Sequence, residues 1–448
     1  MCESMGSSCS SICSRVPRVA AKQTGAKEQS ELLKVGSRSE KMKLVTIPLK
    51  VAGAFLVAPF RRLLQPRLRS TWNPRFETYV HLVKKILLEA PNDLTAARSL
   101  ADRSVPNLVL PGGVHRFKER VLVQVDPKER EELAKMSEAA SIGQFIEEGP
   151  ESPRSPREEP MIVEEGVKIK CEWLWPSHHT PNISRKKLVS EIPKNFERLK
   201  NSRPVILYLH GGAFSLCSTG SHRGLLMQLA LTCDCAVYAP NYRRPPETPL
   251  SHAVQDVLTV VDRLETVYGI PRSRIIVAGD SAGGALALLT MLELNRRKEP
   301  QFAAGVLLSP WVDLACTGDL LNAPFDYLPL TKLAIFAHLA AGDSALDDPR
   351  VSAINASPAE LCGLPPLCVQ AGEVEVLLSQ ISRFVDKSKN AGLSVDYKIY
   401  PDMVHAFGMF AFCHETAMQG ITDIRAFIDR TLPGDNSTRD FSKSNTSV

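Results

Sequence analysis

Short apolar segments alternate with stretches of helical periodicity over residues 161–432. This alternation is typical of a mostly parallel β-sheet flanked by helices, an α/β fold. Residues 162–175 alternate in polarity and predict earlier, antiparallel strands at the edge of that sheet. The predicted strands that follow are 205–209, 236–239, 275–278, 306–308, 367–371 and 395–400, and the predicted helices lie near 222–232, 250–268, 283–297, 331–340, 375–391 and 414–431.

The residues before this sheet follow other patterns. Over 72–90, apolar side chains recur at helical spacing on one face and predict a helix that packs on the protein. Residues 147–160 are rich in proline and charge, and they predict a disordered insertion or linker because they have too little apolar surface to bury.

The apolar run 44–60 is at the short limit for crossing a bilayer. Lys50 lies near its centre, and two prolines interrupt it. A membrane-spanning helix, an in-plane amphipathic anchor and a helix packed on the protein are therefore equally compatible with this run.

Charge and cysteine content exclude several classes of protein. The 54 basic and 49 acidic residues of the 448-residue chain form no basic block, so nucleic acid is not an expected partner. The 11 cysteines are irregularly spaced and define neither a disulfide framework nor a four-ligand zinc site. Cys233 and Cys235 are expected to be buried strand residues. The amino terminus lacks the order of a cleaved signal peptide, and we expect its Cys2, Cys9 and Cys13 to lie in a disordered tail rather than to carry palmitate.

The segment 274–289 places a serine between a predicted strand and a predicted helix. It reads RIIVA, then Gly279-Asp-Ser-Ala-Gly283, then a run of small residues, which is the context in which G-x-S-x-G indicates a nucleophile. A sharp turn exposes the Ser281 hydroxyl at the carboxyl edge of the sheet, and this turn needs residues without bulky side chains two positions before and after the serine. At a helix start, backbone N–H groups also point toward a developing anion.

A glycine-containing turn, His210-Gly-Gly-Ala-Phe214, follows the first strong strand. Glycines allow the backbone to approach a substrate carbonyl, and their N–H groups can join that of Ala282 in holding a tetrahedral oxyanion. The turn precedes Ser281 in the order that this chemistry requires.

A serine hydroxyl is a weak nucleophile unless a base accepts its proton and a carboxylate orients that base. Of the ten histidines, His405 follows the last predicted strand, in a loop at the carboxyl edge of the sheet. His210 is better assigned to support of the glycine turn, and His338 to a helix. The acid is expected in AGEVEVLL, residues 371–378, which contains Glu373 and Glu375 and follows the penultimate strand. The order serine, acid, histidine matches that of an α/β-hydrolase.

Five separated motifs in one order resemble the hormone-sensitive lipase family of α/β-hydrolases. Carried over by position, the resemblance implies that Ser281 is the nucleophile, that His405 is the base, and that Gly211, Gly212 and Ala282 are the oxyanion donors. It also implies Glu375 as the acid, although the commoner pattern G-x-x-D-x-L has an aspartate there, so Glu373 stays an alternative. The motifs, within about 204–432, are HGGAF at 210–214, NYRRPPETP at 241–249, GDSAGG at 279–284, GEVEVLL at 372–378 and DMVHAF at 402–407.

The resemblance also implies a helical cap over the site, built from about 65–150 and 315–350. Some relatives are anchored to the endoplasmic reticulum through an amino-terminal segment, which 44–60 resembles only in position. We therefore expect the protein in the cytoplasm or associated with that membrane. The expected organisation is a tail at 1–64 that includes the apolar run, a cap-forming helical region at 65–160 with the disordered insertion, an α/β-hydrolase catalytic domain at 161–432, and a disordered tail at 433–448.

The sequence thus predicts a carboxylesterase- or lipase-like serine hydrolase that cleaves lipophilic esters through an acyl-enzyme, without a metal or organic cofactor. One alternative is a catalytically inert ligand-binding protein on the same fold, as the plant gibberellin receptors are in this family. Those receptors lack the catalytic histidine, whereas Ser281 and His405 are both present here. An amidase or N-deacetylase differs only in the leaving group and is a further alternative. The small-molecule ester, its acyl length and the oligomeric state are not defined by the sequence.

Overall fold

The computed structural model describes residues 69, 71–89, 94, 97–99, 101, 111–124, 161–163, 166–179, 203–318 and 323–432. The apolar run 44–60, the insertion 147–160, the three amino-terminal cysteines and the tail 433–448 lie outside the described residues. None of the helices within these ranges combines the length and the apolar character needed to cross a membrane.

A nine-stranded sheet organises the described chain, with the order β1-β3-β5-β4-β6-β7-β8-β9 and with β2 paired to β3. Neighbours from β5 to β9 are parallel, whereas β1, β2 and β3 form antiparallel pairs and β3 is antiparallel to β5. The predicted α/β-hydrolase fold, with antiparallel strands at one edge, is therefore confirmed. The strands are β1 (Val114–Val123), β2 (Met161–Val163), β3 (Gly166–Pro176), β4 (Val205–Leu209), β5 (Ala236–Pro240), β6 (Ile275–Asp280), β7 (Ala304–Leu308), β8 (Leu367–Gly372) and β9 (Val395–Tyr400).

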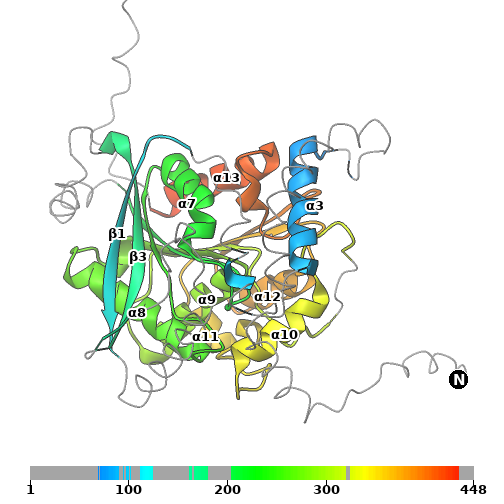
Figure 1. The fold of residues 1–448 in the computed structure, drawn as a ribbon. Coiled ribbons are helices and arrows are strands. Elements are labelled where there is room, and N and C mark those ends of the chain that lie inside the picture. The colour runs from blue at the N-terminus through cyan, green and yellow to red at the C-terminus, as the bar shows by residue number, and fades with distance from the viewer. Residues whose placement is uncertain are drawn as a thin grey trace, which may run out of the picture.

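Helices cover both faces of the sheet (Figure 1). Successive side chains of a strand point to opposite faces, so Ile206 and Tyr208 of β4 pack with α7 and α13, whereas Leu207 and Leu209 pack with α8 and α9. The described helices are α3 (Pro74–Glu89), α7 (Thr219–Cys233), α8 (Leu250–Thr266), α9 (Ser281–Arg297), α10 (Leu330–Ala341), α11 (Pro358–Cys362), α12 (Leu378–Asn390) and α13 (Glu415–Thr431), with short 3-10 turns η1 (Ser177–His179), η2 (Arg272–Arg274), η3 (Ala353–Asn355) and η4 (Phe407–Phe410).

Strand β1 differs from the sequence prediction, which placed these residues in the helical region 65–160. Its sequence, VHRFKERVLV, contains four charged residues and is therefore hard to recognise as a strand, but Arg116 and Glu119 pair with charged groups elsewhere in the fold. Glu119 accepts hydrogen bonds from the Tyr238 and Tyr268 hydroxyls and from the guanidinium group of Arg263. The sheet therefore begins before residue 161.

Helix α3, predicted over 72–90, lies beside the chain that follows β9 (Figure 1). Trp72 and Phe76 are buried there, and Phe76 packs edge-on against Phe410 at 5.3 Å between ring centroids. The Trp72 indole N–H donates to the carbonyl oxygen of Asp402 at 2.8 Å. The amino-terminal region thus contacts the loop that carries His405.

Candidate active site

Ser281 lies in a sharp turn between β6 and α9. Its φ of 53° is in the left-handed region, which is unfavourable for a residue with a Cβ atom. The turn brings backbone atoms so close together that a Cβ at Gly279 or Gly283 would overlap the carbonyl oxygen of Leu209 at the end of β4. The glycine requirement predicted for this turn therefore has a direct steric cause, and Ser281 is 8% exposed at the carboxyl edge of the sheet.

The glycine turn after β4 is tied to the residue before Ser281. The backbone N–H of Gly211 donates to Asp280 Oδ1 at 3.0 Å and lies 3.3 Å from His222 Nε2. Gly211 was expected to donate to an oxyanion, but in the folded protein its N–H donates to Asp280 instead. The sequence prediction of three donors therefore differs from the structure at Gly211.

Other backbone N–H groups remain available near Ser281. Those of Gly212 and Ala213 make no hydrogen bond within the described chain, and both residues have positive φ values, 116° and 52°. Ala282 lies in the first turn of α9, where N–H groups have no intrahelical acceptor. These donors and the positive end of the helix dipole favour an anion beside Ser281.

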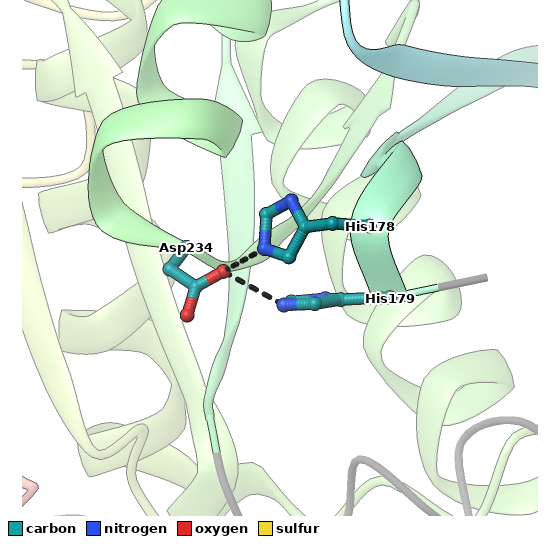
Figure 2. Close-up of side chains that lie close together, drawn as sticks. All are labelled: His178, His179 and Asp234. Atoms are coloured by element: carbon teal, nitrogen blue, oxygen red, sulfur yellow. Dashed lines mark hydrogen bonds and ion pairs between the residues drawn. The ribbon is translucent and has the colours of Figure 1, made fainter. Parts of the chain in front are cut away.

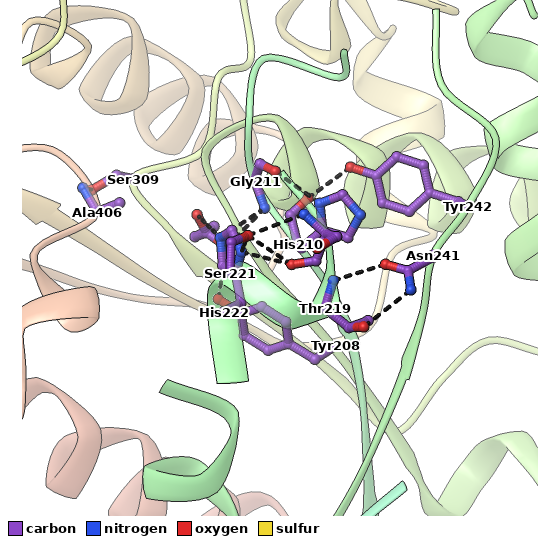
Figure 3. A network of polar contacts seen from close by, with 12 residues as sticks. Tyr208, His210, Gly211, Thr219, Ser221, His222, Asn241, Tyr242, Ser309 and Ala406 are labelled. Carbon is purple, nitrogen blue, oxygen red and sulfur yellow. Dashed lines mark hydrogen bonds and ion pairs between the residues drawn. The ribbon is translucent and has the colours of Figure 1, made fainter. Parts of the chain in front are cut away.

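The buried Asp280 carboxylate contacts three groups of a polar network, Tyr208, Gly211 and His222, which Figure 3 labels. It accepts a hydrogen bond from the Tyr208 hydroxyl at 2.8 Å, and its Oδ2 lies 3.2 Å from His222 Nε2. Burial alone would raise the pKa of Asp280, but His222 and the hydrogen bonds from Tyr208 and Gly211 outweigh it and lower that pKa. Asp280 is therefore ionised at neutral pH and holds the glycine turn against β6.

His210 supports the glycine turn, as its position in the sequence suggested. Its ring stacks on Tyr242 at 4.5 Å between centroids, and its Nδ1 lies 2.8 Å from the carbonyl oxygen of Gly211. The Tyr242 hydroxyl donates to the carbonyl oxygen of His210 at 2.7 Å (Figure 3). Burial lowers the pKa of His210 to about 3, so this imidazole is neutral.

His405 and Glu375 come together at the ends of β9 and β8. His405 Nδ1 lies 3.8 Å from Glu375 Oε2, and both side chains are buried. Glu373 contacts a different group, because its Oε2 accepts the backbone N–H of Asp402 at 2.9 Å. Of the two glutamates left open by the sequence, Glu375 is thus the one beside the imidazole.

Burial controls the charge of this pair. It lowers the pKa of His405 to about 4, an effect that Asp280 partly opposes, so the imidazole is neutral and able to accept a proton at pH 7. Burial also raises the pKa of Glu375. The Ser309 hydroxyl donates to Oε2 of Glu375 at 2.5 Å, and this hydrogen bond opposes the rise. Ser281 and His405 share no hydrogen bond in the described residues, although their loops lie at the same edge of the sheet.

Several residues of the site carry no local sequence signal. Ser309, just after β7, donates to Glu375 and accepts the backbone N–H of Ala406 at 3.0 Å. Figure 3 shows Ser309 and Ala406 next to each other. Asp326 accepts backbone N–H groups from both loops of the pair. Of the three supporting residues Asp280, Ser309 and Asp326, only Asp280 belongs to a motif that the sequence analysis identified.

No group of three metal-ligating side chains is found at this edge of the described sheet. A group of that kind, His178, His179 and Asp234, lies at the opposite edge, between the end of β3 and the start of β5 (Figure 2).

Comparisons with known proteins agree with this geometry. A family model described as the alpha/beta hydrolase fold matches residues 206–409. The chain is 35% identical over 230 residues to an acetyl-hydrolase of Streptomyces hygroscopicus, covering 51% of this chain and 76% of the relative. It is 34% identical over 259 residues to an esterase of Acinetobacter venetianus, covering 57% and 84%.

Solved structures of hormone-sensitive lipase family members also match the chain. An esterase from the bacterial hormone-sensitive lipase family superposes with a TM-score of 0.61 at 25% identity, over 80% of this chain and 99% of that one. A hormone-sensitive lipase from a metagenome library superposes with a TM-score of 0.59 at 25% identity, over 81% and 99%. The chain belongs to the hormone-sensitive lipase family of α/β-hydrolases. These relatives confirm the predicted class, a carboxylesterase- or lipase-like hydrolase acting on a small-molecule ester.

Proposed function

We propose that Ser281, His405 and Glu375 form the catalytic triad of an esterase for lipophilic carboxylic esters. The observation that carries the proposal is the strained turn at Ser281, which begins a helix beside N–H groups that have no acceptor among the described residues. A left-handed serine costs about 1–3 kcal/mol and persists only where the surrounding structure enforces it. The 3.8 Å approach of Glu375 to His405 supports the remaining two assignments.

In this mechanism, His405 Nε2 accepts the Ser281 hydroxyl proton as Oγ attacks the ester carbonyl carbon. The resulting oxyanion is held by the N–H groups of Gly212 and Ala282, with Ala213 in place of the predicted Gly211. His405 then protonates the leaving alcohol, and water hydrolyses the acyl-enzyme by the same route. Glu375 holds the His405 tautomer and stabilises the imidazolium that forms in each step.

We also propose the substrate range and the organisation of the chain. Relatives named esterase and acetyl-hydrolase support esters of short or medium acyl length. Half-buried Phe325 and Tyr327, beside the loop of His405, would favour lipophilic groups. We keep the predicted division at 1–64, 65–160, 161–432 and 433–448 as a proposal, with β1 added to the catalytic sheet and with α3 and α10 as parts of a cap.

Replacing Ser281 with alanine should lower ester hydrolysis by on the order of 10³-fold or more, because nucleophile and base act as a unit. The measurement is the hydrolysis rate of p-nitrophenyl esters of graded acyl length. Ser382→Ala on α12 is the matched control and should leave the rate unchanged, since the one side-chain hydrogen bond of Ser382 among the described residues is to the Tyr397 hydroxyl. Substantial residual activity in Ser281→Ala would remove Ser281 from the mechanism.

The two glutamates give a paired prediction. Glu375→Gln should lower kcat by roughly 10²- to 10⁴-fold with little change in KM, as loss of a triad acid does. Glu373→Gln should cost less than about tenfold, because the Glu373 carboxylate accepts the backbone N–H of Asp402 and has no other hydrogen bond among the described residues. Steady-state kinetics of both variants test this, and the reverse ranking would make Glu373 the acid.

Membrane association through the apolar run 44–60 is a further proposal, based on its length and composition. Deleting residues 1–62 should move the protein from the membrane pellet to the supernatant on ultracentrifugation and leave esterase activity intact, since every motif lies beyond residue 203. A full-length chain found in the supernatant would exclude the anchor. A truncated chain that unfolds would show that the run is part of the core.

A further inference from the structure

A single buried carboxylate connects both loops of the proposed triad. Asp326 lies between β7 and α10 and is 1% exposed. Its Oδ2 accepts the backbone N–H of Val376 at 2.9 Å, and its Oδ1 accepts those of His405 at 3.1 Å and Tyr327 at 2.8 Å. Val376 follows Glu375 directly. Asp326 therefore binds the backbone next to Glu375, the proposed acid, and also the backbone of His405, the proposed base.

The chemical surroundings of Asp326 suit this bridging role. A buried carboxylate normally needs a cation, but charge-assisted hydrogen bonds from backbone N–H groups can take its place. Here three N–H groups fill three acceptor positions, and the described residues provide no ion pair to Asp326. Burial raises the pKa of Asp326 to about 6, and the backbone N–H groups oppose this rise.

The segment that contains Asp326 also reaches the imidazole itself. The ring of Tyr327 lies edge-on to that of His405, at 6.0 Å between centroids, and near Phe410 at 6.1 Å. The position of His405 is therefore defined from its backbone and from its ring by two adjacent residues of the proposed cap.

We propose that Asp326 is a positioning residue, which sets His405 relative to Glu375 and couples the segment before α10 to the reaction. This inference rests on the proposed triad. Misplacing a reacting group by about 1 Å can cost about 10²-fold in rate. Loss of the bridge should therefore lower kcat more than it changes substrate binding.

The test is Asp326→Asn in the full-length protein, because the amide has the same shape but sets an N–H donor against a backbone N–H. We expect kcat to fall roughly 10- to 100-fold with KM changed less than about threefold. Amide hydrogen exchange at Val376 and His405 should also become about tenfold faster or more. Asp313→Asn is the matched control, since Asp313 is equally buried but accepts from Thr317 and Arg383, away from His405.

The outcomes separate this inference from the proposed triad. An active Ser281→Ala variant would refute the triad. If Ser281→Ala is inactive but Asp326→Asn has a normal kcat, only the proposed role of Asp326 is refuted. An equal fall of kcat in Asp313→Asn would also refute it, because the effect would then follow general destabilisation. If Asp326→Asn does not fold, Asp326→Glu keeps the charge but displaces both oxygens, and normal kcat in that variant would contradict the inference.

A second, independent observation concerns the cluster at the opposite edge of the sheet (Figure 2). His178 Nε2 and His179 Nε2 both lie 2.7 Å from Asp234 Oδ1, and the three atoms are within 4.8 Å of one another. Successive side chains of a 3-10 helix point about 120° apart, so adjacent imidazoles on η1 do not converge without a common partner.

We infer that His178, His179 and Asp234 form a surface site for a divalent transition metal, with Zn²⁺ as the best-matched ion. Two imidazole nitrogens and one carboxylate oxygen are a common ligand set for Zn²⁺ and leave a position for water. Bonds of about 2.0–2.2 Å to such an ion would separate the ligand atoms by roughly 3.3 Å. The two 2.7 Å distances from the imidazole nitrogens to Asp234 Oδ1 would therefore each lengthen by roughly 0.6 Å when the ion binds. The ion would join η1 to the turn between α7 and β5.

Isothermal titration of the full-length protein with Zn²⁺ tests this site. We expect one equivalent to bind with a Kd of about 10 µM or lower, and about tenfold or more weaker binding in His179→Ala and Asp234→Asn. His338→Ala, which removes an exposed histidine on α10, is the matched control and should bind normally. Absence of micromolar binding, or equal binding in the two cluster variants, would overturn the inference.

Discussion

The close approach of the Ser281 turn to the end of β4 determines the geometry of the whole site. The turn has a left-handed residue at its centre, and it fits only because Gly279 and Gly283 have no side chain to meet the carbonyl oxygen of Leu209. Helix α9 is buried along most of its length, so it cannot shift to relieve the strain. Packing of this helix therefore offsets a local cost of about 1–3 kcal/mol.

Buried carboxylates join the loops at this edge of the sheet to one another. Asp280 connects the glycine turn to β6, and Glu375 connects β8 to Ser309. Asp326 connects the segment before α10 to the loops after β8 and β9. Their partners are mainly backbone N–H groups and hydroxyls, which hold a loop at a defined place without adding a mobile cation. Strands adjacent in the sheet thus present their loops to one another in a fixed arrangement.

Local sequence patterns predicted the strands and the turn at Ser281, because these depend on residues that are close together in the sequence. The strands β4 and β9 agree with the predicted ranges to the residue, and the turn at Ser281 follows from its glycines. Strand β1 was missed because the partners of its charges are distant in sequence. The use of the Gly211 N–H was also missed, since it depends on a carboxylate 69 residues away. Asp326 belongs to no motif, and only the folded chain brings it to both loops.

The proposed mechanism requires one activated hydroxyl, that of Ser281. The most direct test is to treat the full-length protein with a fluorophosphonate, digest it and locate the adduct by mass spectrometry. We expect one adduct per chain, on the peptide that contains Ser281, and a loss of esterase activity in proportion to the yield of the adduct. An adduct on another serine such as Ser309, or full inactivation without modification of Ser281, would contradict the proposed mechanism.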